Sequence, residues 1–177
     1  MVFTISYIVV KLNSIVISQI KNIKLRLKNN LEKVKDHITK KILTVNPGNN
    51  VGNIKEILAK QARQFETIGY VYVVDDDKRL VGVASLKQIL QENNETPVEK
   101  LMIKNIIRIR DDAHQIKAVS LALKHGLWSI PVVDKENHLL GVIPHKIILS
   151  IFHHKVREDV LRSDGIHHKN KEIEALD

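Results

Sequence analysis

One 20-residue pattern occurs twice in this chain, and it constrains the fold more than any other feature. Residues 71–90 read VYVVDDDKRLVGVASLKQIL, and residues 130–149 read IPVVDKENHLLGVIPHKIIL. At an offset of 59 residues, 9 of the 20 positions are identical. The identical pairs are Val73/Val132, Val74/Val133, Asp75/Asp134, Leu80/Leu139, Gly82/Gly141, Val83/Val142, Lys87/Lys146, Ile89/Ile148 and Leu90/Leu149. Repetition at a fixed spacing indicates one structural unit that is built twice.

Each copy shows the same order of local signals. An apolar run ends in Asp, a polar turn follows, and a second apolar run contains a glycine before a helical pattern begins. Neither run alternates apolar and polar residues, so we expect both faces of each sheet to be covered. A short strand and an amphipathic helix precede each copy. The predicted fold is therefore mixed α/β (α+β), with two β-α-β-β-α units.

Turn residues and caps set the expected element boundaries. In the first unit we expect strands at 42–45, 70–74 and 80–84, a helix capped by Asn49 or Asn50, and a helix at 85–91 that a Ser85–Gln88 capping box begins. In the second unit we expect a short helix from residue 96, strands at 106–109, 128–133 and 139–143, and a helix that ends at Gly126. Asp112 and Gln115 are expected to cap that helix. The last helix is predicted at 144–162, ended by residues 163–165.

The N-terminal 41 residues differ from the rest of the chain in charge. They hold nine bases and two acids, a balance of +7 out of the net +8. Apolar residues at positions 20, 23, 27, 31, 34 and 38 follow helical spacing, which predicts a basic amphipathic helix. Such a helix fits a membrane surface or nucleic acid, or it packs on the body of the protein or on a second copy. No aromatic residue lies among the bases, which argues against single-strand binding.

Composition excludes several kinds of function. The chain has no cysteine, which rules out a disulfide scaffold, a thiolate nucleophile and a cysteine-ligated metal. The chain has no uninterrupted apolar run of about 18 residues, so we expect no membrane-spanning helix. The apolar start lacks the features of a signal peptide. No catalytic triad, P-loop or dinucleotide fingerprint occurs, so we expect no enzymatic activity.

The repeated residues resemble a known family. Ile-Pro-Val-Val-Asp at 130–134, followed by Leu139, Gly141 and Val142, is similar to the pattern of tandem CBS domains, also called the Bateman module. The Glu66 to Asp75 stretch and the 157–161 stretch (Arg-Glu-Asp-Val-Leu) resemble the cytosolic CBS region of MgtE-type magnesium transporters. The resemblance implies two units related by a pseudo-twofold axis. It also implies a regulatory module that senses Mg²⁺ or an adenine nucleotide and controls a membrane pore.

In CBS modules, Ser/Thr-x-x-Asp at the start of each unit's last helix contacts the ribose of an adenine nucleotide. The first unit has Ser85 and Gln88 at these positions, and the second has Pro144 and Ile147. The resemblance therefore implies a weakened AMP or ATP site in the first cleft and none in the second. The alternative is that Ser85 and Gln88 serve only as a helix cap. The candidate nucleotide-binding residues are Thr44, Tyr70, Tyr72, Ser85, Gln88 and Pro131.

Acidic residues are the candidates for Mg²⁺, which prefers carboxylate oxygens. Residues 75–77 are read as a hairpin turn and residues 111–112 as a helix cap. The transporter family also carries acids at the start of the final helix, where this chain has residues 145–147, His-Lys-Ile. Glu158 and Asp159 match the family and are the predicted metal ligands, with a solvated helix face as the alternative. The histidine pairs at 153–154 and 167–168 lack a third ligand at a suitable spacing.

These inferences give one functional hypothesis and one alternative. The predicted domains are a basic helical segment (1–41), a first CBS domain (42–95), a second with a long final helix (96–165) and a charged tail (166–177). The expected partners are a second copy and a membrane transporter or channel domain, with nucleic acid disfavoured. The expected location is the cytoplasm, at the inner face of a membrane. The alternative is a free-standing adaptor that binds a membrane or nucleic acid through its basic helix.

Overall fold

The computed structural model describes residues 17–18 and 32–174, with the side chains of the last helix described up to Leu161. The chain divides into two compact parts, residues 1–32 and 33–177, and the labelled helices and strands of the described residues lie in the second. Most of the predicted N-terminal helix and the last three residues of the charged tail fall outside the described residues. Residues 17 and 18 are helical.

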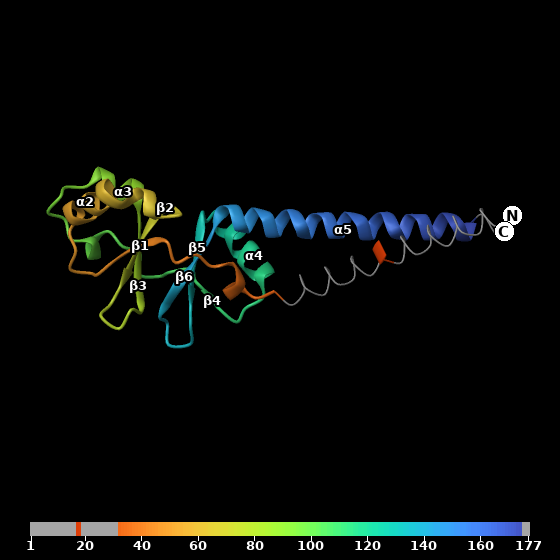
Figure 1. Cartoon of the computed structure of the whole chain (residues 1–177), viewed down its shortest axis with the longest axis horizontal. Helices are drawn as coiled ribbons and strands as arrows, with labels where there is room; N and C mark the ends of the chain where they lie inside the picture. Colours follow the sequence, from red (N-terminus) through yellow and green to blue (C-terminus); the bar gives the residue numbers. More distant parts are fainter. Residues whose placement is uncertain (1–16, 19–31, 175–177) are drawn as a thin grey trace. The chain divides into compact units, whose positions relative to one another are not determined.

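Each repeat forms one three-stranded sheet with two helices (Figure 1). The first repeat contains β1 (Ile42–Val45), α2 (Val51–Gln61), the 3-10 turn η2 (Ala62–Gln64), β2 (Thr67–Val74), β3 (Leu80–Ser85) and α3 (Leu86–Gln91). The second contains η3 (Val98–Lys100), β4 (Ile109–Arg110), α4 (Gln115–His125), β5 (Ser129–Val133), β6 (Leu139–Pro144) and α5 (His145–Glu174). The predicted fold class and the β-α-β-β-α order are confirmed.

The two sheets have the same topology. β1 is parallel to β2, which is antiparallel to β3, and β4, β5 and β6 repeat this arrangement. Parallel neighbours require a crossover, and α2 and α4 provide it. Each sheet is covered on both faces, which explains why its strands are apolar throughout instead of alternating with polar residues. One face packs on its own helices, and the other contributes to a core shared by both repeats through Ile42, Tyr72, Leu80, Val133 and Val142.

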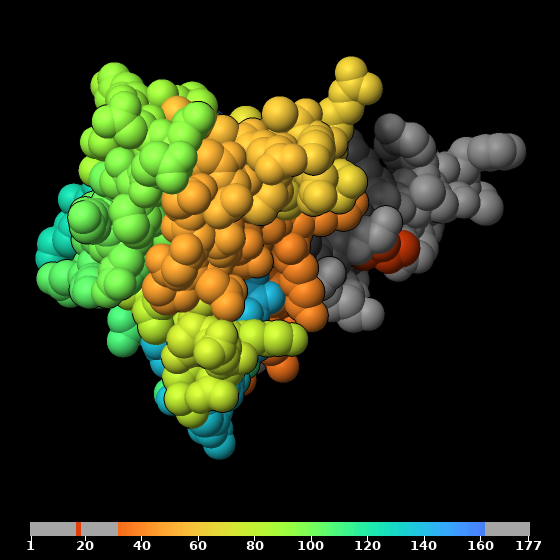
Figure 2. Space-filling model, turned by 90° about the vertical axis from the view of Figure 1, so that its left-hand side faces the viewer, coloured from red at the N-terminus to blue at the C-terminus, as the bar shows by residue number. Residues whose placement is uncertain are grey.

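The two hairpins that follow β2 and β5 pair with each other across the repeats. The amide of Leu80 donates to the carbonyl of Asn137 (2.9 Å), and the amide of Leu139 donates to the carbonyl of Lys78 (3.0 Å). Lys78 and Asn137 both have positive φ, 63° and 70°, at positions 59 residues apart. Because the two bonds are reciprocal, the pseudo-twofold axis passes between the hairpins. Figure 2 shows the yellow-green and cyan hairpins together at the lower edge of the molecule.

The segment before β1 corrects one prediction. Val34 and Ile38 were expected to continue an amphipathic helix, but Val34–His37 is a 3-10 turn (η1) and Ile38 is extended. The cause is pairing with the second repeat: the amide of Val34 donates to Ala113, and Thr39 exchanges two backbone bonds with Val142. Val34 is fully buried in the core of the second repeat. Residues 33–39 therefore form a strap on the second repeat.

Further boundaries differ from the prediction. β2 begins at Thr67 instead of residue 70, and the short helix expected from residue 96 is the 3-10 turn Val98–Lys100. His114, not Asp112, caps α4: its Nδ1 accepts from the amide of Ile116 at 3.2 Å, and Asp112 instead pairs with Arg110. The expected strand at 106–109 is reduced to Ile109–Arg110. The last helix continues through Gly165 to Glu174, because one glycine within a helix costs only about 1 kcal/mol. Gly126 ends α4 in the left-handed conformation, as predicted.

Candidate functional site

Three of the candidate nucleotide-binding residues lie together where β3 passes into α3. Tyr70 is the register partner of Ser85 on the adjacent strand. The Ser85 Oγ accepts a hydrogen bond from the amide of Gln88 at 3.1 Å, and the Gln88 side chain is exposed. Only this half of the predicted capping box forms among the described residues, which leaves the Gln88 amide side chain available. Thr44, also exposed, lies on β1 beside Tyr72.

Tyr72 and Pro131 are both buried rather than open to a ligand. Tyr72 is 1% exposed, and its hydroxyl lies 2.7 Å from the Oγ of Ser129 in the other repeat. Burial raises the pKa of Tyr72 to about 12, although the Ser129 hydrogen bond opposes the shift. Pro131 occupies the equivalent position in β5 and is also buried. Tyr72 therefore belongs to the contact between the repeats and joins one sheet to the other.

The start of α5 has a different chemistry from the start of α3. Lys146, on the first turn of α5, forms an ion pair with Glu66 at 2.5 Å. The hydrogen bond from Lys146, followed by one from Thr39, lowers the pKa of the Glu66 carboxyl. Pro144 and Ile147 stand where the first repeat has Ser85 and Gln88. This end of the second repeat is therefore occupied by a contact between the repeats.

The predicted Mg²⁺ ligands lie on α5 beyond the sheets. Asp159 is paired with Lys155 one turn earlier, at 2.9 Å. Among the described residues, neither Asp159 nor Glu158 belongs to a group of three potential metal ligands. Adjacent residues on a helix do not face the same point, so these two carboxylates need oxygens from elsewhere to complete a magnesium shell.

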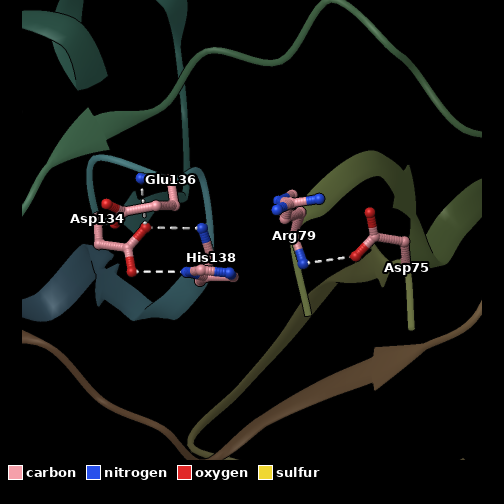
Figure 3. Close-up of polar contacts among 5 residues, drawn as sticks. All are labelled: Asp75, Arg79, Asp134, Glu136 and His138. Atoms are coloured by element: carbon pink, nitrogen blue, oxygen red, sulfur yellow. Dashed lines mark hydrogen bonds and ion pairs between the residues drawn. The ribbon is translucent and has the colours of Figure 1, made fainter. Parts of the chain in front are cut away.

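A group that sequence reasoning missed lies in the β5–β6 hairpin (Figure 3). Ligand atoms of Asp134, Glu136 and His138 lie within 4.8 Å of one another. Both carboxylate oxygens of Asp134 already accept hydrogen bonds, from the amides of Glu136 (3.0 Å) and His138 (2.9 Å) and from His138 Nδ1 (2.8 Å). The group therefore closes the turn. Asp75 and Arg79 are the equivalents of Asp134 and His138 in the first repeat, so the 59-residue offset was a usable signal.

The charges in this turn hold the Asp134 carboxylate in its ionised form. Partial desolvation alone raises the pKa of Asp134. The side-chain and backbone hydrogen bonds from His138, its charge and the Glu136 amide outweigh that effect, and the net pKa is lowered. In the first repeat, the Oδ1 of Asp75 accepts from the amide of Arg79 at 2.7 Å, while the Arg79 guanidinium pairs with Asp77.

Two cavities flank the paired hairpins, one in each repeat. The cavity of the first repeat, about 460 Å³, is lined by Thr44, Asn46, Val74, Asp75, Asp76, Lys78 and Leu139. That of the second, about 310 Å³, is lined by Arg108, Ile109, Arg110, Val133, Asp134, Lys135 and Asn137. Both lie where the paired strands end in the hairpin. The sequence alone did not single out Arg108 or Arg110, because only the strand register brings them beside the turn.

A third hollow is apolar. It has a volume of about 230 Å³ and lies between α4 and α5, where the Trp128 ring packs on His145 with centroids 5.0 Å apart. Its lining includes Leu123, Leu149 and Phe152, all of which are exposed large apolar side chains. Exposed apolar residues continue along α5 at Val156 and Val160.

Comparison with known proteins identifies the family. The CBS domain pattern matches residues 34–95 and again residues 98–154. The chain belongs to the CBS domain family. It is a CBS pair, a regulatory module, and the expected resemblance to the cytosolic region of MgtE-type transporters is confirmed.

The most similar relatives include magnesium transporters. The chain is 30% identical over 123 residues to the magnesium transporter MgtE of Thermus thermophilus, covering 70% of this chain and 27% of the transporter. It is 26% identical over 129 residues to MgtE of Enterococcus faecalis, covering 73% of this chain and 28% of that protein. The chain thus spans little more than a quarter of these relatives. No helix among the described residues combines the length and apolar character needed to cross a membrane.

Solved structures give the same result. The cytosolic domain of the Mg²⁺ channel MgtE in complex with ATP superposes with a TM-score of 0.66 at 29% identity, over 68% of this chain and 48% of that one. The soluble part of a magnesium transporter gives a TM-score of 0.68 at 26% identity, over 70% and 48%. A CBS pair with an ACT domain from Thermotoga maritima matches the fold at 20% identity, with a TM-score of 0.59.

Proposed function

We propose that this CBS pair is a non-catalytic sensor that binds an adenine nucleotide in its first cleft and regulates a membrane domain of the magnesium-transporter type. The observation that carries the proposal is the grouping of Tyr70, Ser85 and Gln88 at one end of the first sheet. The similar cytosolic domain of MgtE was solved in complex with ATP, which supports the ligand class.

The grouped side chains offer suitable chemistry for a nucleoside. The Ser85 hydroxyl accepts from the Gln88 amide and retains its proton for donation. Gln88 offers an amide oxygen to the ribose hydroxyls in place of a carboxylate, which weakens the contact because the stronger hydrogen bonds involve a charged group. Tyr70 is half-buried and supplies an aromatic surface beside Ser85. We therefore propose a site of modest affinity, with exposed Thr44 at its margin.

Tyr72 and Pro131 have a different part in this proposal. Tyr72 bonds to Ser129 across the repeats, and Pro131 is buried in the neighbouring strand. A ligand held in the cleft shifts the arrangement of the repeats only if it binds one arrangement more tightly. We propose that these two residues couple ligand binding in the cleft to the arrangement of the two repeats.

Mg²⁺ is the second proposed ligand, bound through Glu158 and Asp159. Because these residues lie on α5 beyond the sheets, we propose that a neighbouring domain or a second copy supplies the remaining oxygens. The exposed apolar side chains Leu149, Phe152 and Val156 on the same helix support a homodimer. The proposed location is the cytoplasmic face of the membrane that holds the transporter domain.

The test is the melting temperature with AMP, ATP or Mg²⁺ at fixed ionic strength. A ligand at about 100 times its dissociation constant stabilises the folded state by about 2.7 kcal/mol. In a chain of this size we expect a rise of roughly 5–10 °C with a nucleotide. Substituting Ser85 and Gln88 by alanine should abolish the rise, whereas the matched control Gln91→Ala, on the same helix, should retain it. No rise with either nucleotide would overturn the proposal.

The magnesium arm uses isosteric variants. Glu158→Gln with Asp159→Asn should remove any rise caused by Mg²⁺, and Glu95→Gln, an exposed carboxylate elsewhere, should not. The adaptor alternative depends on residues mostly outside the described part of the chain. It predicts binding to anionic vesicles or nucleic acid that weakens steeply as salt is raised.

A further inference from the structure

The cavity of the second repeat is lined mainly by basic side chains, unlike the equivalent cavity of the first repeat. Three basic side chains line it, Arg108, Arg110 and Lys135, against one acidic side chain, Asp134. The equivalent cavity of the first repeat has the opposite balance, with one basic and two acidic side chains. Two cavities that share one backbone arrangement therefore present opposite charges.

The strand register shows which residues replaced which. Val45 is paired with Val73, and Ile109 is paired with Val132, 59 residues beyond Val73. Arg108 therefore stands where the first repeat has Thr44. By the same register Arg110 corresponds to Asn46, and the 59-residue offset relates Lys135 to Asp76. All three differences add positive charge to the second cavity.

These charges are not neutralised locally. Within the part of the chain that the structure describes, the side chains of Arg108 and Lys135 have neither a hydrogen bond nor an ion pair. Arg110 is paired only with Asp112, at 3.0 Å, and both side chains are about half exposed (47% and 59%). An exposed pair of this kind is weak. The one carboxylate in the cavity, Asp134, is already bonded to its own turn.

We propose that this cavity binds a phosphate group of a small molecule. Arginine presents a planar fork of donors that matches phosphate oxygens, and lysine adds a point charge. The volume of about 310 Å³ suits a small ligand rather than a polymer. The cavity lies at the hairpin end of the second sheet, whereas Ser85 pairs with Tyr70 at the opposite end of β2 in the first repeat. The inference is therefore independent of the nucleotide site proposed above.

The test is isothermal titration of the full chain with inorganic pyrophosphate at constant ionic strength. The variant Arg108→Thr/Arg110→Asn gives the second cavity two residues of the first. It should bind at least about tenfold more weakly, since two charge-assisted contacts are lost. Lys87→Gln/Lys124→Gln removes the same charge from exposed sites on α3 and α4 and should bind within about twofold of the native chain. Lys135→Asp is a second, independent variant with the same expected loss.

Two outcomes overturn the inference: absence of saturable pyrophosphate binding to the native chain, or equal weakening in the cavity and control variants. AMP carries the same phosphate group on a nucleoside, so a competition arm identifies the source. If AMP displaces pyrophosphate and Arg108→Thr/Arg110→Asn weakens that displacement, the cavity accepts nucleotide phosphates. If AMP binds without displacing pyrophosphate, the cavity is specific for smaller phosphates. Unchanged melting temperatures of the variants exclude misfolding.

Discussion

The two repeats share a backbone but differ in what presses against it. Gly82 and Gly141 are equivalent residues of β3 and β6, and in both a side chain is excluded by a close neighbour. Beside Gly82 the neighbour is the flexible side chain of Met102, and beside Gly141 it is the backbone of Thr39. Gly141 also has a φ of +150°. Gly82 thus makes room for a side chain, whereas Gly141 makes room for a backbone segment. The repeat pattern alone does not distinguish these two roles.

The hairpins and cavities teach the same lesson. Reciprocal backbone bonds hold the two hairpins in one geometry. Their side chains have nonetheless diverged, from Arg79 to His138 on the axis and from Asp76 to Lys135 beside it. Backbone pairing preserves the fold, and the side chains that line the cavities are free to acquire different ligands.

The glycine comparison gives the largest expected effect. Gly141→Ala should destabilise the chain by about 2–4 kcal/mol, because the methyl group meets a backbone carbonyl and φ is unfavourable for alanine. Gly82→Ala should cost less, about 1–3 kcal/mol. A rotamer change moves the Sδ and Cγ of Met102 away from the new methyl group, and only the Met102 Cβ, at 2.8 Å, requires a backbone shift. Urea unfolding midpoints measure both.

Gly69→Ala is the matched control, because no atom lies within 4 Å of the position its Cβ would take. If Gly141→Ala is as stable as Gly69→Ala, the strap does not pack on the second sheet as described, and the contrast between the repeats fails.

An intermediate effect is expected at the hydrogen bond between the sheets. The pseudo-symmetric counterpart would join the side chains of Pro131 and Tyr70. Proline has no polar side-chain atom, so this bond cannot form at the equivalent position. Tyr72→Phe should cost about 1–2 kcal/mol, because Ser129, only 3% exposed, loses its partner. Tyr70→Phe, on the same strand, should cost less.

The same bond predicts a pH dependence. The folded pKa of Tyr72 is about 12, above its ordinary value of 10.0. The contribution of the neutral Tyr72 phenol to the free energy of unfolding is fully present below pH 10. It is lost as pH rises from 10 to 12, because in this range the phenol ionises mainly in the unfolded state. The native chain should therefore lose roughly 2 kcal/mol more than Tyr72→Phe over this range. Parallel stability curves for the two proteins would contradict the burial of the phenol.

The smallest effect concerns the two turn aspartates. Asp75→Asn keeps an oxygen acceptor for the Arg79 amide, whereas Asp134→Asn loses the charge that faces His138 Nδ1. The melting temperature should fall by about 1 °C more in Asp134→Asn than in Asp75→Asn at pH 7. Because the pKa of Asp134 is lowered, this difference should vanish as pH falls through that pKa. A difference that persists in acid would assign the effect to packing instead.

Much of the fold was predictable because each repeat carries its own local signals. Three local signals fix the backbone around them: the Asp that follows β2 and β5, the glycine of the returning strand, and Gly126 at the end of α4. The cap of α4 was predicted wrongly. Asp112 is a good capping residue by type, but it pairs with Arg110 and leaves His114 to begin the helix.

The parts that escaped prediction depend on contacts far apart in sequence. The periodicity of Val34 and Ile38 is helical, yet pairing with Ala113 and Val142 overrides it. Arg110 ends a two-residue strand that Arg108 immediately precedes, and their common cavity follows from the register of that strand with β5. Tyr72 was expected to contact a ligand, but the fold buries its ring between the sheets. A site predicted from the sequence of one repeat omits the contacts that residues of the other repeat make with it.

The strap has a consequence for the order in which the chain folds. Thr39 precedes the whole first repeat, but its partner Val142 lies in the last strand of the second. Closing a loop of about 100 residues is slow compared with forming a hairpin, so this contact should form late. During synthesis the first repeat emerges complete while the strap still awaits β6. The docking of residues 33–39 is thus a late step, which closes the core of the second repeat only after nearly the entire pair has left the ribosome.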